Sequence, residues 1–113
     1  MNNCLFCKIA NEKTDTKLVY KDTSVVAFAD INPKAPVHIL IIPKTHIETI
    51  EHLKKTDKDI ISSLILTAQT LAREFKIDKT GYRLVFNVRD HGGQVIKHIH
   101  LHLLGGQQLG DMV

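Results

Sequence analysis

The sequence lacks a long hydrophobic run and lacks an N-terminal targeting pattern. Its longest apolar stretch, from Val37 to Pro43, is interrupted by His38 and is too short to span a membrane. The first residues do not show the basic segment followed by an apolar one that is typical of a signal peptide. We therefore expect a cytoplasmic protein that has no membrane as a partner.

The chain also has few cysteines and no dense run of basic residues. Its 15 Lys and Arg residues face 12 Asp and Glu residues, which gives a formal net charge of +3. No basic run is interleaved with aromatic residues, which argues against a nucleic-acid-binding surface. A small anionic substrate is compatible with this charge. The only two cysteines, Cys4 and Cys7, are not expected to form a structural disulfide in the cytoplasm.

What is present is the composition of an ordinary globular chain, 43% hydrophobic and 24% charged. A length of 113 residues corresponds to one domain, residues 1–113. Residue periodicity predicts strands at 18–20, 25–28, 37–42, 83–88 and 98–104. It also predicts short helices at 4–11 and 45–53, the second capped by Thr45, and a long helix from Asp57 or Thr56 to Phe75. This order predicts an α+β fold: an antiparallel sheet of about five strands with one long helix and one or two short helices on one side.

Three histidines in the last predicted strand are the strongest functional signal. His98, His100 and His102 alternate with apolar residues, and a period of two places them on one strand face. Successive residues on that face are roughly 6.5–7 Å apart. One histidine there would be an ordinary surface residue, but three in strict alternation indicate a site.

Two kinds of chemistry fit this pattern. Histidines at i and i+2 can chelate one metal and leave a position open for water, as in zinc hydrolases. Alternatively, one imidazole is a nucleophile and the others hold its target. An unperturbed pKa near 6.5 leaves imidazole neutral at working pH and suited to attack on phosphorus. The preceding Gly92-Gly93-Gln94 loop favours the second interpretation, because its backbone N–H groups can hold phosphate oxygens, although two glycines are also typical of a plain turn.

The segment His98-Ile-His100-Leu-His102-Leu-Leu resembles the His-x-His-x-His-x-x signature of the histidine triad (HIT) family. The similarity covers nearly the whole chain, including residues 28–38. Asn87 followed by Gly92-Gly93-Gln94, and residues 103–106 after the triad, resemble the Hint branch rather than the Fhit branch. The resemblance implies a homodimeric hydrolase or transferase that binds purine nucleotides such as AMP or GMP and acts on nucleoside phosphoramidates or related α-phosphate derivatives.

The resemblance also implies roles for individual residues. His100 would be the nucleophile that forms a nucleotidyl-histidine, which water then cleaves; His102 would contact the α-phosphate; His98 completes the triad, and His38 would stand behind it. The implied nucleotide ligands are Phe28 and Ile31 at the base, Asp30 at the ribose, and Asn87, Gly93, Gln94 and Val95 at the phosphate. Judged without the resemblance, Phe28 and Ile31 also fit a core, Asp30 fits a turn, and His38 fits a structural histidine.

Val95 departs from the family pattern. Members of the Hint branch usually carry a hydroxyl residue after Gly-Gly-Gln, where it helps to protonate the leaving group. Losing general-acid help costs a factor of roughly 10²–10⁴ unless His91 or water replaces it. An alternative function is therefore a purine nucleotide-binding or regulatory module with vestigial catalysis.

The motif Cys4-x-x-Cys7 alone is compatible with a redox pair, half a zinc site, or two small buried hydrophobes. Bacterial-type histidine triad proteins, and the related galactose-1-phosphate uridylyltransferases, resemble this chain in pairing such a motif with two histidines. The resemblance implies a structural zinc ion at Cys4, Cys7, His46 and His98, with no cofactor needed for the chemistry. His52 and His91 are expected to be solvated surface residues.

Overall fold

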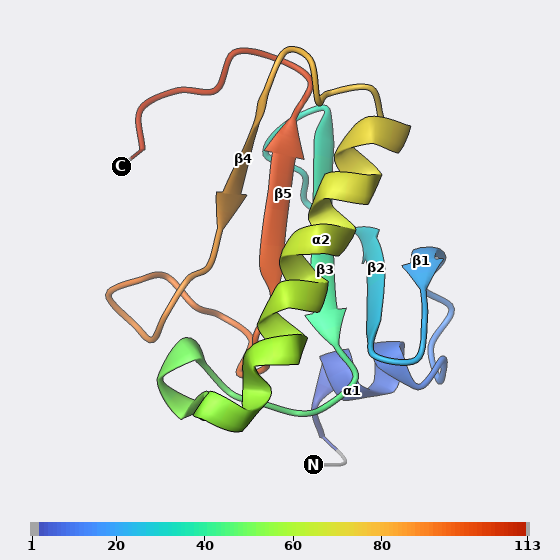
Figure 1. The fold of residues 1–113 in the computed structure, drawn as a ribbon, viewed down its shortest axis with the longest axis vertical. Coiled ribbons are helices and arrows are strands. Elements are labelled where there is room, and N and C mark those ends of the chain that lie inside the picture. Colours follow the sequence, from blue (N-terminus) through green and yellow to red (C-terminus); the bar gives the residue numbers. More distant parts are fainter. Residues whose placement is uncertain (1–2, 113) are drawn as a thin grey trace.

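The computed structural model describes residues 3–112 as a five-stranded sheet with helices on both faces. All neighbouring strands are antiparallel, in the order β1-β2-β3-β5-β4 (Figure 1). The strands are β1 (Leu18–Lys21), β2 (Val25–Ala29), β3 (Val37–Pro43), β4 (Tyr82–Val85) and β5 (Leu101–Gly105). The helices are α1 (Leu5–Ala10), α2 (Lys58–Glu74) and the 3-10 turns η1 (Ile50–His52) and η2 (Lys55–Asp57). The predicted α+β fold, with its antiparallel sheet, long helix and short helices, is confirmed.

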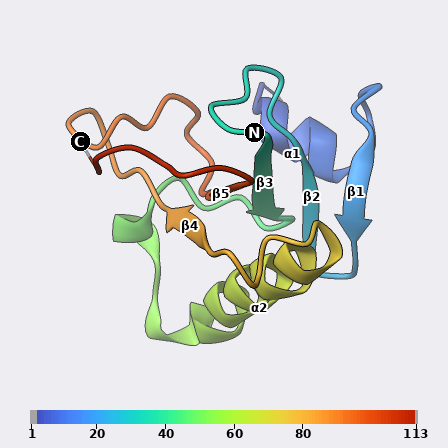
Figure 2. The same cartoon turned by 90° about the horizontal axis from the view of Figure 1, so that it is seen from above.

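The two faces of the sheet are covered by different helices. On one face, Leu64, Ala68 and Leu71 of α2 pack on a fully buried layer of strand residues. On the other face, Phe6 and Ile9 of α1 pack on strand residues of β2 and β3. Figure 2 shows α1 and α2 on opposite sides of the sheet. The expectation that all helices lie on one side was therefore wrong for α1. Strands β2 and β3 are apolar on both faces, so each face needs a cover.

Strand β5 begins at Leu101, three residues later than the predicted start at His98. The reason lies in its partner β3, which ends in Pro43 and so offers no amide N–H to continue the ladder. The Pro43 carbonyl instead accepts a hydrogen bond from Nε2 of His98 at 2.9 Å. The Ile99 amide donates to the Ile47 carbonyl at 2.6 Å. The histidine segment is thus half strand and half extended chain.

The segment before α2 is not the predicted helix 45–53. The cap is Thr49 rather than Thr45, and its Oγ1 accepts from the Glu51 amide at 2.9 Å at the start of η1. The Ile47 carbonyl, which a helix would use internally, is taken by Ile99. The α2 helix itself agrees with its prediction. Within residues 3–112, no helix is long and apolar enough to cross a membrane.

Candidate active site and candidate metal site

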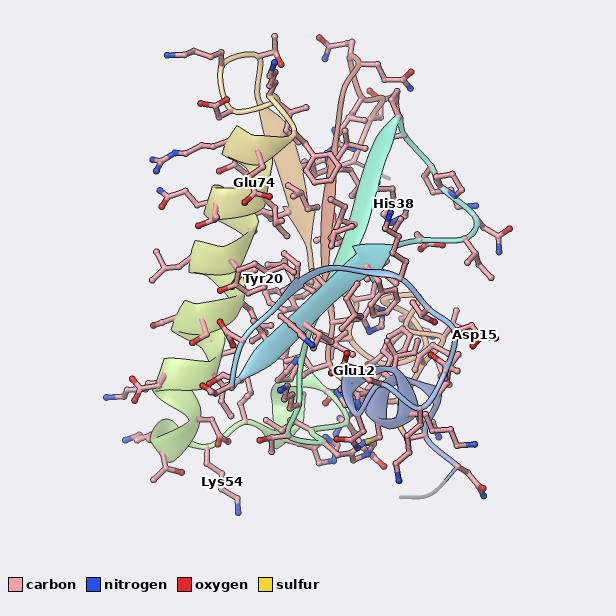
Figure 3. All side chains as sticks on the ribbon, turned by 90° about the vertical axis from the view of Figure 1, so that its right-hand side faces the viewer. Glu12, Asp15, Tyr20, His38, Lys54 and Glu74 are labelled. Atoms are coloured by element: carbon pink, nitrogen blue, oxygen red, sulfur yellow. The ribbon has the colours of Figure 1, made fainter. Side chains whose placement is uncertain are left out.

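Two strands of the sheet bring a pair of histidines together on the face away from α2. His38 comes from β3 and His102 from β5, and Nε2 of His38 lies 2.9 Å from Nδ1 of His102. Figure 3 shows His38 on the side of the sheet opposite α2. The Oδ2 atom of Asp30, in the loop after β2, lies 3.5 Å from Nε2 of His38. The structure therefore groups three of the predicted site residues.

The hydrogen bonds around this pair fix the tautomers. The backbone amide of Lys34 donates to Nδ1 of His38 at 3.0 Å, so that nitrogen carries no hydrogen. Neutral His38 must then carry its hydrogen on Nε2 and donate it to Nδ1 of His102. Since Nδ1 of His102 accepts, the neutral ring carries its hydrogen on Nε2. The outer nitrogen of His102 is thus a hydrogen-bond donor.

His100 has the opposite arrangement. Its Nδ1 donates to the backbone carbonyl of His98 at 2.7 Å, so its Nε2 carries the free lone pair. The ring lies edge-to-face with Phe6, with centroids 5.1 Å apart, and is 5.0 Å from the ring of His102. A bare nitrogen next to a donor nitrogen is the combination that attack on a phosphate group requires.

Burial keeps these rings neutral near pH 7. It lowers the pKa of His38, His98 and His100 below the ordinary value. Burial, followed by the neighbouring His100 and His38, lowers the pKa of His102 to about 4. The Asp30 carboxylate opposes this trend, because it raises the pKa of His38, His100 and His102, but burial outweighs it. Neutral imidazole is the nucleophilic form.

The side chains of Asp30, His38 and His102 are one group that could in principle hold a metal ion, since their ligand atoms lie within 4.8 Å of one another. A cation there would need a bare Nε2 on His38. The Lys34 amide occupies Nδ1 and so places the hydrogen on Nε2. The geometry favours a hydrogen-bonded chain over a cation at this position. In the described part of the chain, no group of three or more potential metal ligands includes His100.

A second cluster combines the two cysteines with two histidines. One ligand atom from each of Cys4, Cys7, His46 and His98 lies within 4.8 Å of the others. The sulfurs of Cys4 and Cys7 are 3.3 and 3.6 Å from Nδ1 of His98, and Cys7 Sγ is 3.3 Å from Nδ1 of His46. Ligands of a tetrahedral zinc ion are separated by roughly 3.5 Å when Zn–S is about 2.3 Å and Zn–N about 2.0–2.1 Å. The four side chains therefore fit such an ion.

The protonation of this cluster also fits a cation. His98 donates Nε2–H to the Pro43 carbonyl, which leaves Nδ1 bare and facing the sulfurs. Burial, then the neighbouring Cys4, raises the pKa of Cys7 to about 11. Two thiols that repel each other as thiolates are the arrangement that a divalent cation stabilises.

Sequence comparison agrees with this geometry. The family model described as the HIT domain matches residues 11–109. The chain belongs to the HIT family. It is 42% identical over 109 residues to a protein of Escherichia coli strain K12 named purine nucleoside phosphoramidase, covering 96% of this chain and 92% of that protein. It is 43% identical over 108 residues to an uncharacterized HIT-like protein of Buchnera aphidicola, covering 96% of each.

Solved structures of HIT proteins share the fold. A HIT family hydrolase from Legionella pneumophila is 48% identical, covers 96% of both chains and superposes with a TM-score of 0.94. A histidine triad protein from Clostridium difficile is 39% identical, covers 100% of this chain and 98% of its own, and gives a TM-score of 0.96.

The glycine loop of this HIT protein is held in shape by its own polar side chains. Asn87 donates Nδ2–H to the Gly92 carbonyl at 2.6 Å, and the Gln94 side chain makes three hydrogen bonds to backbone groups. A Cβ at Gly92 would lie 2.3 Å from the Val88 carbonyl oxygen, and Gly93 has a φ of +80°. The backbone conformation of this loop therefore requires glycine.

The other predicted nucleotide ligands have varied surroundings. Phe28 is buried and packs edge-to-face on Phe6 at 5.5 Å. Asp30 is half-buried, and its Oδ1 accepts from the Asn32 amide at 2.8 Å. Ile31 and Val95 are 92% and 86% exposed, so neither side chain packs against the histidines. The structure groups Asp30 with the histidines but leaves these two apolar side chains in solvent.

Sequence reasoning missed three groups that shape the site. Phe6 contacts His100 and Phe28, and its position between the two cysteines on the apolar side of a short helix was the available signal. The Lys34 amide and the Pro43 carbonyl set the tautomers of His38 and His98. Backbone groups carry no residue-type signal, so only the structure could identify them.

Proposed function

We propose that this single-domain HIT protein hydrolyses purine nucleoside 5′-phosphoramidates, or related α-phosphate derivatives of AMP or GMP, through a nucleotidyl-histidine. The observation that carries the proposal is the pair of opposite tautomers, a bare Nε2 on His100 beside a protonated Nε2 on His102. The 42% identical relative that is named purine nucleoside phosphoramidase supports the substrate class.

In the proposed reaction, Nε2 of His100 attacks the α-phosphorus and forms a P–N bond while the substrate's own P–N bond breaks. The amine leaves with a proton taken from water, since Val95 has no hydroxyl to offer and neutral His102 keeps its Nε2–H. The hydroxide formed takes up the proton that is released when the intermediate is hydrolysed. Water then attacks the nucleotidyl-histidine, releases AMP and restores neutral His100. Nε2–H of His102 and the amide of Val95 stabilise the charge on the equatorial oxygens, since the Gly93 and Gln94 amides donate to the Asp90 and Arg89 carbonyls within the loop.

Asp30 and the residues beside it suit the nucleoside. The carboxylate of Asp30 is half-buried, and it can accept hydrogen bonds from the ribose hydroxyls. Phe6 and Phe28 form an aromatic pair next to His100, and the exposed side chain of Ile31 adds apolar surface beside Asp30. We propose that the base lies against these apolar groups, with Asn87 and the loop from Gly93 to Val95 at the phosphate.

A second candidate function is a purine nucleotide-binding module with little turnover. The observation that favours it is Val95, which has no hydroxyl and is 86% exposed, so the general acid usual in the Hint branch is missing. The two candidates differ in turnover and agree on AMP binding.

We propose a structural role for zinc at Cys4, Cys7, His46 and His98. The S₂N₂ set is typical of closed structural sites. The ion would tie α1 to the histidine segment and would hold Phe6 against His100, because Phe6 lies between the two cysteines. No step of the proposed chemistry uses the ion.

We also propose that the protein is a homodimer that works in the cytoplasm without nucleic acid or membrane partners. The edge strand β4 pairs only with β5 within residues 3–112. Its Tyr82 and Leu84 are 37% and 36% exposed. Uncovered edge strands with apolar side chains invite pairing with another chain, and a second copy offers the same edge.

The test is turnover of adenosine 5′-phosphoramidate by the wild type and three variants. We expect His100→Ala to lower AMP release by at least about 10³-fold and to keep AMP binding. His102→Ala is expected to be impaired, while the surface variant His52→Ala keeps wild-type rates. Tight AMP binding by a wild type without turnover would favour the binding module, and full turnover by His100→Ala would exclude the proposed nucleophile.

A further inference from the structure

We infer that Gln94 is a positioning residue, whose side chain holds the phosphate-binding loop in register with the catalytic histidines. This inference rests on the proposed function, because it assigns the loop to the phosphate. The loop is residues 89–96. The Gln94 side chain makes hydrogen bonds to three backbone groups, two of them at the ends of this loop, so its action is on the backbone that would meet the phosphate.

The Gln94 amide uses both kinds of hydrogen-bonding atom on backbone groups. Its Oε1 accepts from the Arg89 amide at 3.0 Å, at the start of the loop. Its Nε2 donates to the Ile96 carbonyl at 3.0 Å, at the end of the loop. The same Nε2 donates to the Glu48 carbonyl at 2.6 Å, which belongs to a different segment. One side chain therefore ties both ends of the loop to each other and to the chain before η1.

That second segment is itself fixed to the histidines. The Ile47 carbonyl accepts from the Ile99 amide at 2.6 Å, between His98 and His100. Two hydrogen bonds therefore connect the loop to the histidine segment. Gln94 binds the carbonyl of Glu48, and the neighbouring carbonyl of Ile47 binds the amide of Ile99. A shift of the loop relative to His100 would require one of these hydrogen bonds to break.

These connections extend to the candidate metal cluster. His46 lies one residue before Ile47, and His98 lies one residue before Ile99. Their Nδ1 atoms both face the cysteine sulfurs. Gln94 therefore braces the loop against the segment that also presents a potential metal ligand. Hydrogen bonds and sequence adjacency therefore connect the loop, the histidines and the cysteine cluster.

The chemistry at position 94 requires an amide. The site needs one acceptor toward the Arg89 amide and two donors toward the carbonyls of Glu48 and Ile96. Glutamate has the same shape but presents only acceptors when ionised, so it would face two carbonyl oxygens without a hydrogen. Methionine has a similar length and offers no donor. Both substitutions remove the two hydrogen bonds to the Glu48 and Ile96 carbonyls while changing the side-chain volume little.

A loosened loop is expected to weaken binding of the phosphate group and to leave binding of the nucleoside unchanged. Asp30, Phe6 and Phe28 lie on other elements, and none of them contacts Gln94 through a hydrogen bond in the described chain. A misplacement of about 1 Å at a reacting group can cost about 10²-fold in rate. We therefore expect kcat/KM to fall by about 10- to 100-fold, through both a lower kcat and a higher KM, in Gln94→Glu and Gln94→Met.

The experiment compares AMP and adenosine affinity, and phosphoramidate turnover, for the wild type, Gln94→Glu, Gln94→Met and the exposed control Gln107→Glu. We expect both Gln94 variants to lose AMP affinity by about tenfold, with adenosine affinity unchanged, while Gln107→Glu behaves as wild type. An equal loss of adenosine and AMP binding would overturn the inference, because it would indicate general destabilisation. So would wild-type AMP affinity and kcat in both Gln94 variants.

The affinity ratio separates this inference from the proposed function. If the wild type binds AMP but has no turnover, the hydrolase proposal fails and the ratio still tests Gln94. If the wild type binds AMP no better than adenosine, the loop holds no phosphate and the positioning role is excluded.

Discussion

The Nδ1 atom of His100 donates to the backbone carbonyl oxygen of His98 over 2.7 Å. The side chain of His98 points its own Nδ1 toward Cys4 and Cys7, at 3.3 and 3.6 Å. The ring of His98 thus belongs to the candidate metal cluster, while its backbone carbonyl accepts the hydrogen bond from the proposed nucleophile His100. The two sites share a backbone, so a structural change in the first is expected to reach the second.

Removing either cysteine should remove the metal and lower stability. For Cys4→Ser and Cys7→Ser, we expect bound zinc to fall from about one per chain to near zero, because a tetrahedral site needs all four ligands. The melting temperature should drop by about 8 °C or more, which corresponds to roughly 2 kcal/mol for a chain of this size. Elemental analysis and thermal unfolding measure both, with His52→Ser as the control. Unchanged metal content would contradict the site.

Gly92→Ala should damage the loop without a comparable effect from Gly110→Ala. A Cβ at Gly92 would lie 2.3 Å from the Val88 carbonyl oxygen, whereas one at Gly110 would have no atom within 4 Å. We expect Gly92→Ala to cost about 2 kcal/mol of stability and most of the AMP affinity. Urea unfolding and calorimetric titration check this. Equal behaviour of the two variants would be inconsistent with the loop geometry.

Stability should fall as the pH falls from 6.5 toward 4. The unfolded chain binds a proton on each histidine near pH 6.5, whereas burial lowers the pKa of folded His102 to about 4. In that window the unfolded state holds more protons, so acid favours unfolding. The linkage cost from His102 alone is roughly 2 kcal/mol at pH 5.

Urea midpoints measured between pH 7 and 4.5 give this slope directly. His102→Gln should flatten it, while His91→Gln, at an exposed position, should not. A wild-type slope of zero or of opposite sign would mean that His102 is not held neutral in the folded state.

The proposed dimer depends on the free edge of β4. Leu84→Lys places a charge on an exposed position of that edge. We expect the wild type to elute as a dimer in size-exclusion chromatography with light scattering, and Leu84→Lys to shift toward the monomer. Leu66→Lys, at an exposed position on α2, serves as a matched control. A monomeric wild type would exclude the dimer.

Local periodicity was enough to predict much of the fold. The alternation at residues 98–104 and the three- and four-residue spacing in α2 identified a histidine strand and a long helix. The late start of β5, at Leu101 instead of His98, could not be predicted from local sequence, because it depends on Pro43 in β3. The placement of α1 opposite α2 depends on both faces of β2 and β3 being apolar.

The site was predictable in its side chains and unpredictable in its backbone. Cys4, Cys7, His46 and His98 were named from the resemblance, and the structure brings them together. The tautomer of His38 is set by the amide of Lys34, and the function inferred for Gln94 depends on the carbonyl of Glu48, 46 residues away in sequence. Contacts of this kind follow from the fold and not from residue type.

The central claim is that His100 carries the nucleotide during turnover. The most direct measurement is acid-free rapid quenching during hydrolysis of adenosine 5′-phosphoramidate, followed by mass spectrometry of the peptide that contains residues 98–102. A transient adenylyl group on His100, absent in His100→Ala, is the predicted result. Steady turnover with no adenylylated peptide, or an adenylyl group on another residue, would contradict the claim.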